Sequence, residues 1–145
     1  MSKSIKIPGA DHAIAIVPSR NSVVVTVAGR VIADTARALV LREASHTPVF
    51  YIPRRDVDMA LLLRSDHVTY CPYKGDCAYY SIPIGGHRSV NAAWTYEAPY
   101  TAVAAIRDHL AFYPDRVDSI VEWFGDYPSP LPGHDLALGP VEYAA

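Results

Sequence analysis

Both cysteines of the chain lie in one short stretch, TYCPYKGDCAYYSI (residues 69–82), which also contains an isolated lysine. Lys74 stands between Cys71 and Cys77, and beyond residue 6 every other basic side chain apart from histidine is an arginine. A deprotonated thiol can act as a nucleophile or a metal ligand, and a nearby ammonium group favours that charge state. The stretch therefore has the residue types for thiol chemistry, for a metal site or for an anion-binding turn.

The Cys71 thiol allows two interpretations. It is either a nucleophile activated by the positive charge of Lys74 and His67, or a small buried residue on a strand next to Pro72. The buried interpretation is favoured, because free cysteine is among the most buried residue types. We expect both thiols to be reduced, because the chain shows no export signal and disulfides are rare in a reducing compartment.

A zinc site could draw on Cys71, Cys77, His67 and His87. Structural zinc sites usually place two cysteines two to four residues apart and add a second ligand pair. The spacing here is longer and the second pair is missing, so we expect neither a metal nor another cofactor.

Lys74 and Gly75 are expected in a tight turn over residues 72–76, in which Gly75 takes a positive φ. As an exposed turn residue, Lys74 would contribute little to stability. Its side chain would point either into solvent or towards a bound anion, and both interpretations remain open. The segment is not a Walker A loop, because the required glycine spacing is absent.

Three further groups could hold a ligand. Arg54 and Arg55 carry guanidinium forks that suit phosphate or carboxylate, but neighbouring strand residues point oppositely, so at most one should face a given pocket. Asp56 could cap a helix or act as a base or metal ligand, and Trp94 with Tyr96 could belong to the core or line a pocket. No catalytic residue is assigned. The candidate ligand-binding residues are Arg54, Asp56, Thr69, Cys71, Lys74, Gly75, Trp94 and Tyr96.

These residues must be positioned by a fold that is mainly β. Alternating apolar residues predict a hairpin over residues 22–33, turning at Ala28–Arg30, and further strands over 38–43, 48–53, 68–71, 78–84 and 117–123. Residues 84–87 resemble a hairpin turn leading into a strand over 90–96, and short helices are predicted near 57–63 and 102–110. The fold class is a single antiparallel domain, as a curved sheet or two packed sheets, over residues 1–124. The proline- and glycine-rich tail, residues 125–145, is expected to lack regular structure.

Composition excludes several classes of protein. With 145 residues, half of them hydrophobic and 19% charged, the chain can build one core and is not disordered. A net charge of −2 without a basic stripe argues against nucleic-acid binding. No apolar run is long enough to span a bilayer, so we expect a cytoplasmic protein without a membrane partner.

The order of motifs resembles a bacterial family catalogued as domain of unknown function 427, over about residues 22–120. The most specific pieces are T-x-C-P-x-K-G, here Thr69 to Gly75, and A-x-W-x-Y, here Ala92 to Tyr96. The family has sometimes carried a nucleotidyltransferase-type label. It usually has an acidic residue where this chain has Arg55, and a small residue where Cys77 stands.

Three functions are compatible with these residues. The preferred hypothesis is a domain that binds a small anionic or polar ligand in a pocket formed by the Cys71–Gly75 loop, with Arg54, Lys74 and Tyr96 as contacts. The second is a transferase acting on a nucleotide-type substrate, with Lys74 neutralising phosphate charge and Asp56 as base or metal ligand. The third is a homo-oligomeric assembly module without a ligand.

Overall fold

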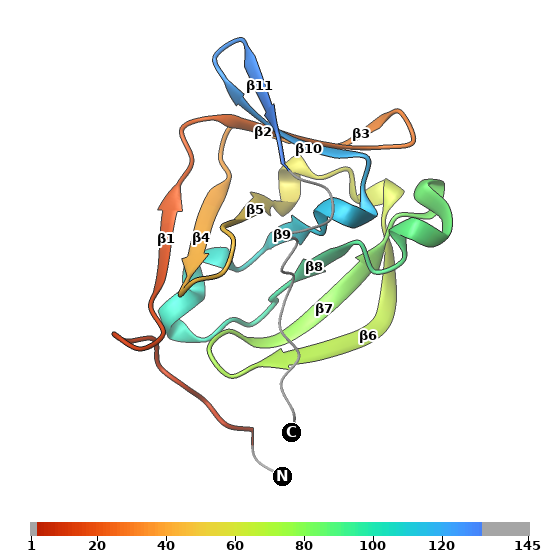
Figure 1. Ribbon diagram of the computed structural model, residues 1–145. Helices are drawn as coiled ribbons and strands as arrows, with labels where there is room; N and C mark the ends of the chain where they lie inside the picture. The colour runs from red at the N-terminus through yellow and green to blue at the C-terminus, as the bar shows by residue number, and fades with distance from the viewer. Residues whose placement is uncertain (1–2, 132–145) are drawn as a thin grey trace.

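The computed structural model describes residues 3–131 as two antiparallel β-sheets (Figure 1). The seven-stranded sheet has the strand order β1-β4-β5-β9-β8-β7-β6 and the four-stranded sheet has the order β11-β10-β2-β3. The strand bounds are β1 Ile14–Pro18, β2 Ser22–Val27, β3 Arg30–Thr35, β4 Leu39–Glu43, β5 Val49–Pro53, β6 Leu63–Cys71, β7 Gly75–Ser81, β8 Ala93–Thr95, β9 His109–Phe112, β10 Ser119–Phe124 and β11 Tyr127–Pro130. The predicted mainly β, antiparallel fold class is confirmed.

The helical segments are all short 3₁₀ turns in the described part of the chain. They are η1 Arg54–Asp56, η2 Met59–Leu61, η3 Pro83–Ser89, η4 Thr101–Ile106 and η5 Pro114–Arg116. Each lies in a connection between two strands, with η1 and η2 in the same one, so the site residues are held by strand ends and by the turns between them.

The central strands of the seven-stranded sheet are buried on both faces, because their successive side chains enter two different cores. On β5, Tyr51 and Ile52 belong to different clusters, and so do Tyr79 and Tyr80 on β7. This is the two-residue period of a strand. The first core also takes the inward residues of β2 and β3, and the second contains both cysteines.

The β2–β3 hairpin confirms the prediction for residues 22–33. Ala28 and Gly29 have φ values of 51° and 74°, and a two-residue type I′ turn requires a positive φ at both of its central residues. The strands predicted over 38–43, 48–53, 68–71 and 117–123 are also present, as β4, β5, β6 and β10.

Both predicted short helices are present, but as 3₁₀ turns that are shorter than the expected ranges. Residues 57–63 contain only the turn η2, and β6 then begins at Leu63, which pairs with Ser81 of β7. Residues 102–110 divide between η4 and β9, because Leu110 pairs with Ile52 of β5. Strand pairing across the chain overrides the local helical spacing in both places.

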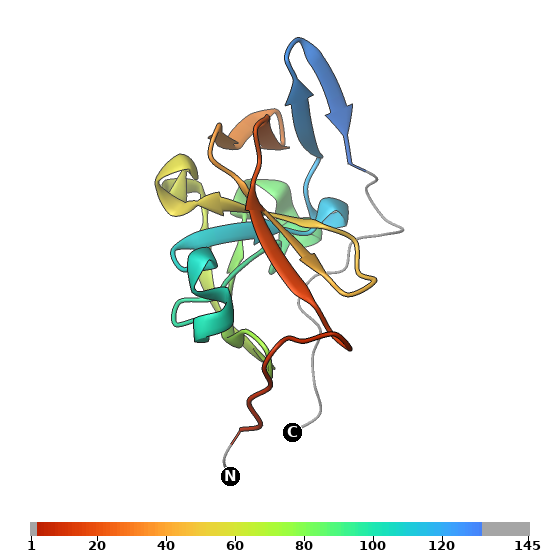
Figure 2. The same cartoon turned by 90° about the vertical axis from the view of Figure 1, so that its left-hand side faces the viewer.

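Two predictions about the end of the sheet also need correction. Residues 83–89 form η3 and not a hairpin turn, and the strand expected over 90–96 is reduced to β8. The tail was expected to be irregular from Gly125, but β11 pairs with β10 at Tyr127–Pro130. This hairpin projects from the rest of the fold (Figures 1 and 2). Residues 132–145, the rest of that tail, lie outside the described residues.

Candidate functional site

The turn between β6 and β7 contains the residues singled out in the sequence. The Lys74 amide donates to the Cys71 carbonyl at 3.2 Å, and Gly75 takes the expected positive φ, 109°. The Lys74 side chain does not point into solvent, however, because the residue is only 5% exposed. The expectation of an exposed lysine is wrong, because the turn directs this side chain inwards.

Lys74 is buried because it finds a carboxylate. Its ammonium donates to Glu43 at the end of β4, and the other Glu43 oxygen lies 2.6 Å from His12 Nε2. Lys74 Nζ also lies 3.7 Å from Cys71 Sγ and 5.9 Å from the centre of the Tyr96 ring. A buried charge of this kind requires a partner, and Glu43 supplies it.

The Glu43 carboxyl remains the charged partner of this group. Burial acts to raise its pKa, but the charge and hydrogen bond of Lys74, with the His12 contact, outweigh burial and hold the pKa below its ordinary value of 4.5. The Lys74 charge is therefore neutralised inside the protein, and it offers little attraction to an external anion.

Both thiols are free and buried, each 1% exposed. Burial raises the pKa of Cys77 to about 11, although hydrogen bonds from Tyr79, Thr69 and Tyr96 act in the opposite direction. A protonated, enclosed thiol is a poor nucleophile. Cys71 lies in the second core at the end of β6, in agreement with the interpretation that it is a small buried residue on a strand. Within residues 3–131, no three His, Cys, Asp or Glu side chains are grouped as a metal would require.

The other sequence candidates near this turn are core residues. The Thr69 and Tyr79 hydroxyls are 2.8 Å apart, and Trp94 Nε1 donates to the Tyr51 hydroxyl at 3.2 Å. Tyr96 is fully buried and its hydroxyl has no nitrogen or oxygen partner among the described residues. Burial raises the pKa of Tyr96 well above its ordinary value. Trp94 and Tyr96 share the second core, so they do not line an open pocket.

The remaining candidates, Arg54 and Asp56, lie away from the β6–β7 turn, in η1. The Asp56 carboxylate accepts a hydrogen bond from the Thr35 hydroxyl at 2.7 Å, so it does not cap a helix as expected. Arg54 is part of a surface pocket of about 840 Å³ that the sequence did not reveal. It is lined by Arg37, Pro53, Arg54, Arg55, Val57, Met59, Asp108 and His109.

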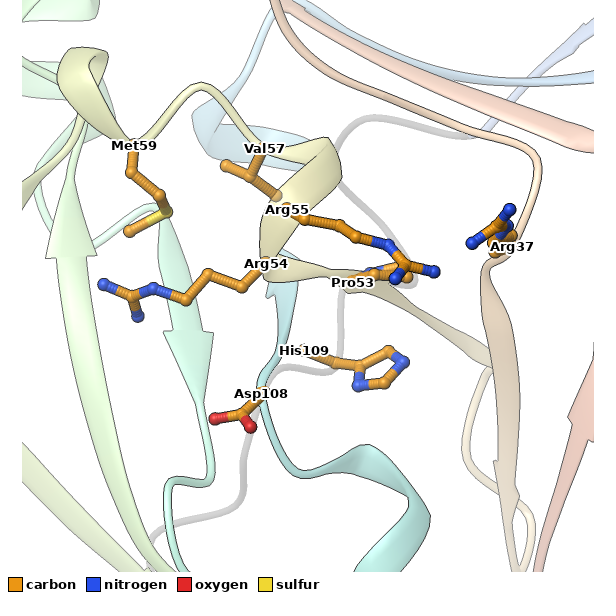
Figure 3. Close-up of a pocket in the computed structure, with 8 residues that line it drawn as sticks. All are labelled: Arg37, Pro53, Arg54, Arg55, Val57, Met59, Asp108 and His109. Atoms are coloured by element: carbon orange, nitrogen blue, oxygen red, sulfur yellow. The ribbon is translucent and has the colours of Figure 1, made fainter.

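Figure 3 shows how the charged side chains of this arginine pocket lie. Arg55 extends towards the side of the pocket where Arg37 and the His109 ring lie, whereas Arg54 extends to the opposite side. Both neighbouring arginines line the pocket, contrary to expectation, because they lie on a 3₁₀ turn and not on a strand. Arg54 donates to the Tyr80 hydroxyl at 3.2 Å, but no residue in 3–131 pairs with the guanidinium of Arg37 or Arg55.

The structure thus divides the candidate residues between two places. Thr69, Cys71, Lys74, Gly75, Trp94 and Tyr96 gather around the β6–β7 turn, and Arg54 with Asp56 lies at η1. Sequence reasoning missed His12 and Glu43 at the first place, and Arg37 and His109 at the second. These residues are far apart in the sequence, and only strand pairing brings them together.

Within the described part of the chain, no helix has both the length and the apolar character to cross a membrane.

Comparison with known proteins supports a family but no activity. A comparison with curated proteins finds no match. Residues 15–123 match the family model NTP_transf_9, described as Domain of unknown function (DUF427), which confirms the resemblance seen in the motifs around Lys74 and Trp94. The chain therefore belongs to this DUF427 family.

Proposed function

We propose that this domain binds a small anionic ligand, a phosphate or carboxylate, in the arginine pocket. The observation that carries the proposal is that Arg37 and Arg55 lie on the same side of one pocket, and neither has an acidic partner in residues 3–131. Two positive charges that line one pocket repel each other, and an anion bound beside them would offset that repulsion. Guanidinium forks also match the paired oxygens of phosphate and carboxylate.

Three elements supply the cationic end of this pocket. Arg37 precedes β4, Arg55 belongs to η1 and His109 begins β9. The His109 ring is held by a 2.7 Å contact between its Nδ1 and the Arg107 carbonyl, which leaves Nε2 for a ligand. Asp108 lines the same pocket, but its carboxylate points away from the Arg37–Arg55 pair.

The rest of the pocket lining mixes apolar and charged groups. Val57, Met59 and Pro53 are apolar, and the Arg54 guanidinium, on the side of Met59, lies 5.6 Å from the centre of the Tyr80 ring. The apolar residues favour a ligand that carries a small apolar part beside its anionic group. Ligand sites commonly combine an apolar lining with a few fixed polar groups.

The sequence hypothesis placed the ligand at the Cys71–Gly75 loop with Lys74 as a contact. Because Glu43 neutralises Lys74, we place the anion at the arginine pocket and retain Arg54 as a contact. A cytoplasmic location belongs to the same proposal, and the two free thiols support it, since a reducing compartment keeps cysteines in this state.

The test is calorimetric titration with phenyl phosphate, inorganic phosphate and benzoate. We expect saturable binding, tightest for phenyl phosphate, and a loss of about tenfold or more in Arg37→Ala and in Arg55→Ala. Arg30→Ala is the matched control, because Arg30 is exposed and outside the pocket. Binding that is absent in the parent protein, or equal in all variants, would overturn the proposal.

The projecting hairpin favours a second function, homo-oligomeric assembly. Trp123, Phe124 and Tyr127 are 37%, 49% and 78% exposed, and these aromatic residues are neighbours around the β10–β11 turn. Pro128 and Pro130 on β11 lack the N–H groups that strand addition needs, so a second copy would pack through side chains. Analytical ultracentrifugation of the parent and of Phe124→Glu/Tyr127→Lys tests this function. A monomeric parent would contradict it.

A further inference from the structure

A second pocket, separate from the arginine pocket, lies where the N-terminal segment crosses the β6–β7 turn. The Lys6 amide donates to the Pro72 carbonyl at 2.9 Å, and this contact holds the segment against the turn. The pocket has a volume of about 340 Å³, and its lining includes Lys6, Asp11, His12 and Tyr73. This volume is within the range of small-molecule sites.

The His12 ring is the most closely fixed group of this N-terminal pocket. It stacks on Tyr73 with the ring centres 4.1 Å apart and an angle of 7° between the planes. Its Nε2 lies 2.6 Å from Glu43, whose charged carboxylate can only accept, so Nε2 carries the hydrogen in the neutral ring. The other ring nitrogen, Nδ1, has no hydrogen-bond partner in residues 3–131 and carries the free lone pair.

The groups behind His12 are arranged as positioning residues. The side chains of Glu43 and Lys74 are each 7% exposed, whereas that of His12 is 22% exposed and borders the pocket. A buried ion pair is an expensive way to fill a core, because apolar residues of similar volume are often as stabilising. Here the pair also holds one imidazole in a single orientation. A buried carboxylate that orients an imidazole and stabilises its protonated form is the arrangement of a general base.

We propose that His12 is a general base facing the N-terminal pocket, with Glu43 and Lys74 as its positioning residues. The ligand is a small organic acid that carries a hydroxyl or amine group. Its carboxylate lies against the exposed Lys6 ammonium, and its hydroxyl or amine group donates a hydrogen bond to the Nδ1 lone pair of His12. The charged and titratable groups around this position are Lys6, Asp11, His46, Glu43, Tyr73 and Lys74. This inference does not depend on the arginine pocket, so either proposal can fail alone.

The first experiment measures the reactivity of His12 with diethyl pyrocarbonate. The Nδ1 lone pair attacks a carbonyl carbon, a C–N bond forms and the C–O bond to the bridging oxygen breaks. Ethyl carbonate leaves, accepts the Nε2 proton and decomposes to ethanol and carbon dioxide. We expect diethyl pyrocarbonate to modify His12 faster than the exposed His87. Peptide mass spectrometry measures the extent of modification at each histidine over time. If His12 is only a packed core residue, it should react more slowly than His87. That result would overturn the proposal that His12 is a general base.

The variants then separate positioning from packing. Glu43→Gln should lower the His12 reaction rate by roughly tenfold or more, since the amide no longer fixes the proton on Nε2. His46→Gln is the control, because His46 lies edge-on to His12 at 6.2 Å but makes no hydrogen bond with it, and its rate should equal the parent rate. If Glu43→Gln fails to fold, ¹⁵N spectra of the parent decide the matter. Hydrogen on Nε2 supports the proposal, and hydrogen on Nδ1 overturns it.

The ligand is tested with glycolate, a small hydroxy acid, followed through the His12 ring resonances. We expect a saturable shift whose midpoint rises about tenfold in Lys6→Gln. Lys3→Gln is the control, because Lys3 is exposed, pairs with Asp76 and does not line the pocket. A response that does not saturate, or one that is equal in both variants, would overturn the ligand assignment.

Discussion

Glu43 at the end of β4 and Lys74 in the β6–β7 turn form a buried ion pair between segments 31 residues apart in sequence. The pair joins β4 to the β6–β7 turn across the seven-stranded sheet, in which β5, β9 and β8 lie between β4 and β7. Its partners therefore meet over one face of the sheet, beside the second core. This contact determines what Lys74 contributes to the protein.

Removing Lys74 should be strongly destabilising. Lys74→Ala leaves the Glu43 carboxylate buried without its ammonium partner, and the expected loss is about 3–5 kcal/mol in the free energy of unfolding. Urea denaturation measures the change. Lys3→Ala is the matched control, because the Lys3–Asp76 pair is exposed and should contribute less than about 1 kcal/mol. Equal midpoints for the two variants would contradict a structural role for the ion pair.

Acid should weaken the protein through Glu43. The pKa of Glu43 in the folded protein lies below its ordinary value of 4.5, so its stabilisation is complete above that value and is lost as the pH falls through the folded pKa. Between about pH 3 and pH 6, the urea midpoint of the parent should fall more steeply than that of Glu43→Gln. If the urea midpoints of the parent and of Glu43→Gln change in parallel with pH, the Glu43 carboxyl has the same pKa in the folded and unfolded protein, which contradicts the prediction.

The thiols should be slow to react in the folded protein. Cys77 is buried and its pKa is raised to about 11, so iodoacetamide near neutral pH should label it many times faster in urea than in native buffer. Cys71→Ser isolates Cys77 for this measurement. Two thiols should titrate after denaturation without reductant. A native rate equal to the denatured rate would indicate an open site.

Two buried tyrosines should differ in what their hydroxyl groups contribute. Tyr96→Phe removes a hydroxyl that has no nitrogen or oxygen partner in residues 3–131 and only a weak hydrogen bond with the Cys77 thiol, so we expect little change in stability. Tyr51→Phe is the matched variant, because it leaves the buried Trp94 N–H without its acceptor and should cost about 1–3 kcal/mol. Thermal unfolding compares the two. An equal loss in both would mean that Tyr96 has a strong partner after all.

The sequence by itself determined the parts of the fold that depend on near neighbours. Alternating valines and a two-residue turn were enough to predict the β2–β3 hairpin, and Gly75 was identified as the residue that allows a positive φ. The T-x-C-P-x-K-G motif also identified the family. Each of these features is local, because steric limits on φ and the two-residue period of a strand act within a few residues.

Tertiary structure decided the rest. Residues 102–110 have helical spacing, but Leu110 belongs to β9 because Ile52 pairs with it across the sheet. The burial of the Lys74 side chain depended on Glu43, and Arg37 shares a pocket with both neighbouring arginines because Arg54 and Arg55 lie on the 3₁₀ turn η1. Ion pairs and strand pairs join residues that are close in space but distant in the sequence. The alternation of apolar residues therefore predicted a β fold, but neither of the two pockets could be predicted from the sequence.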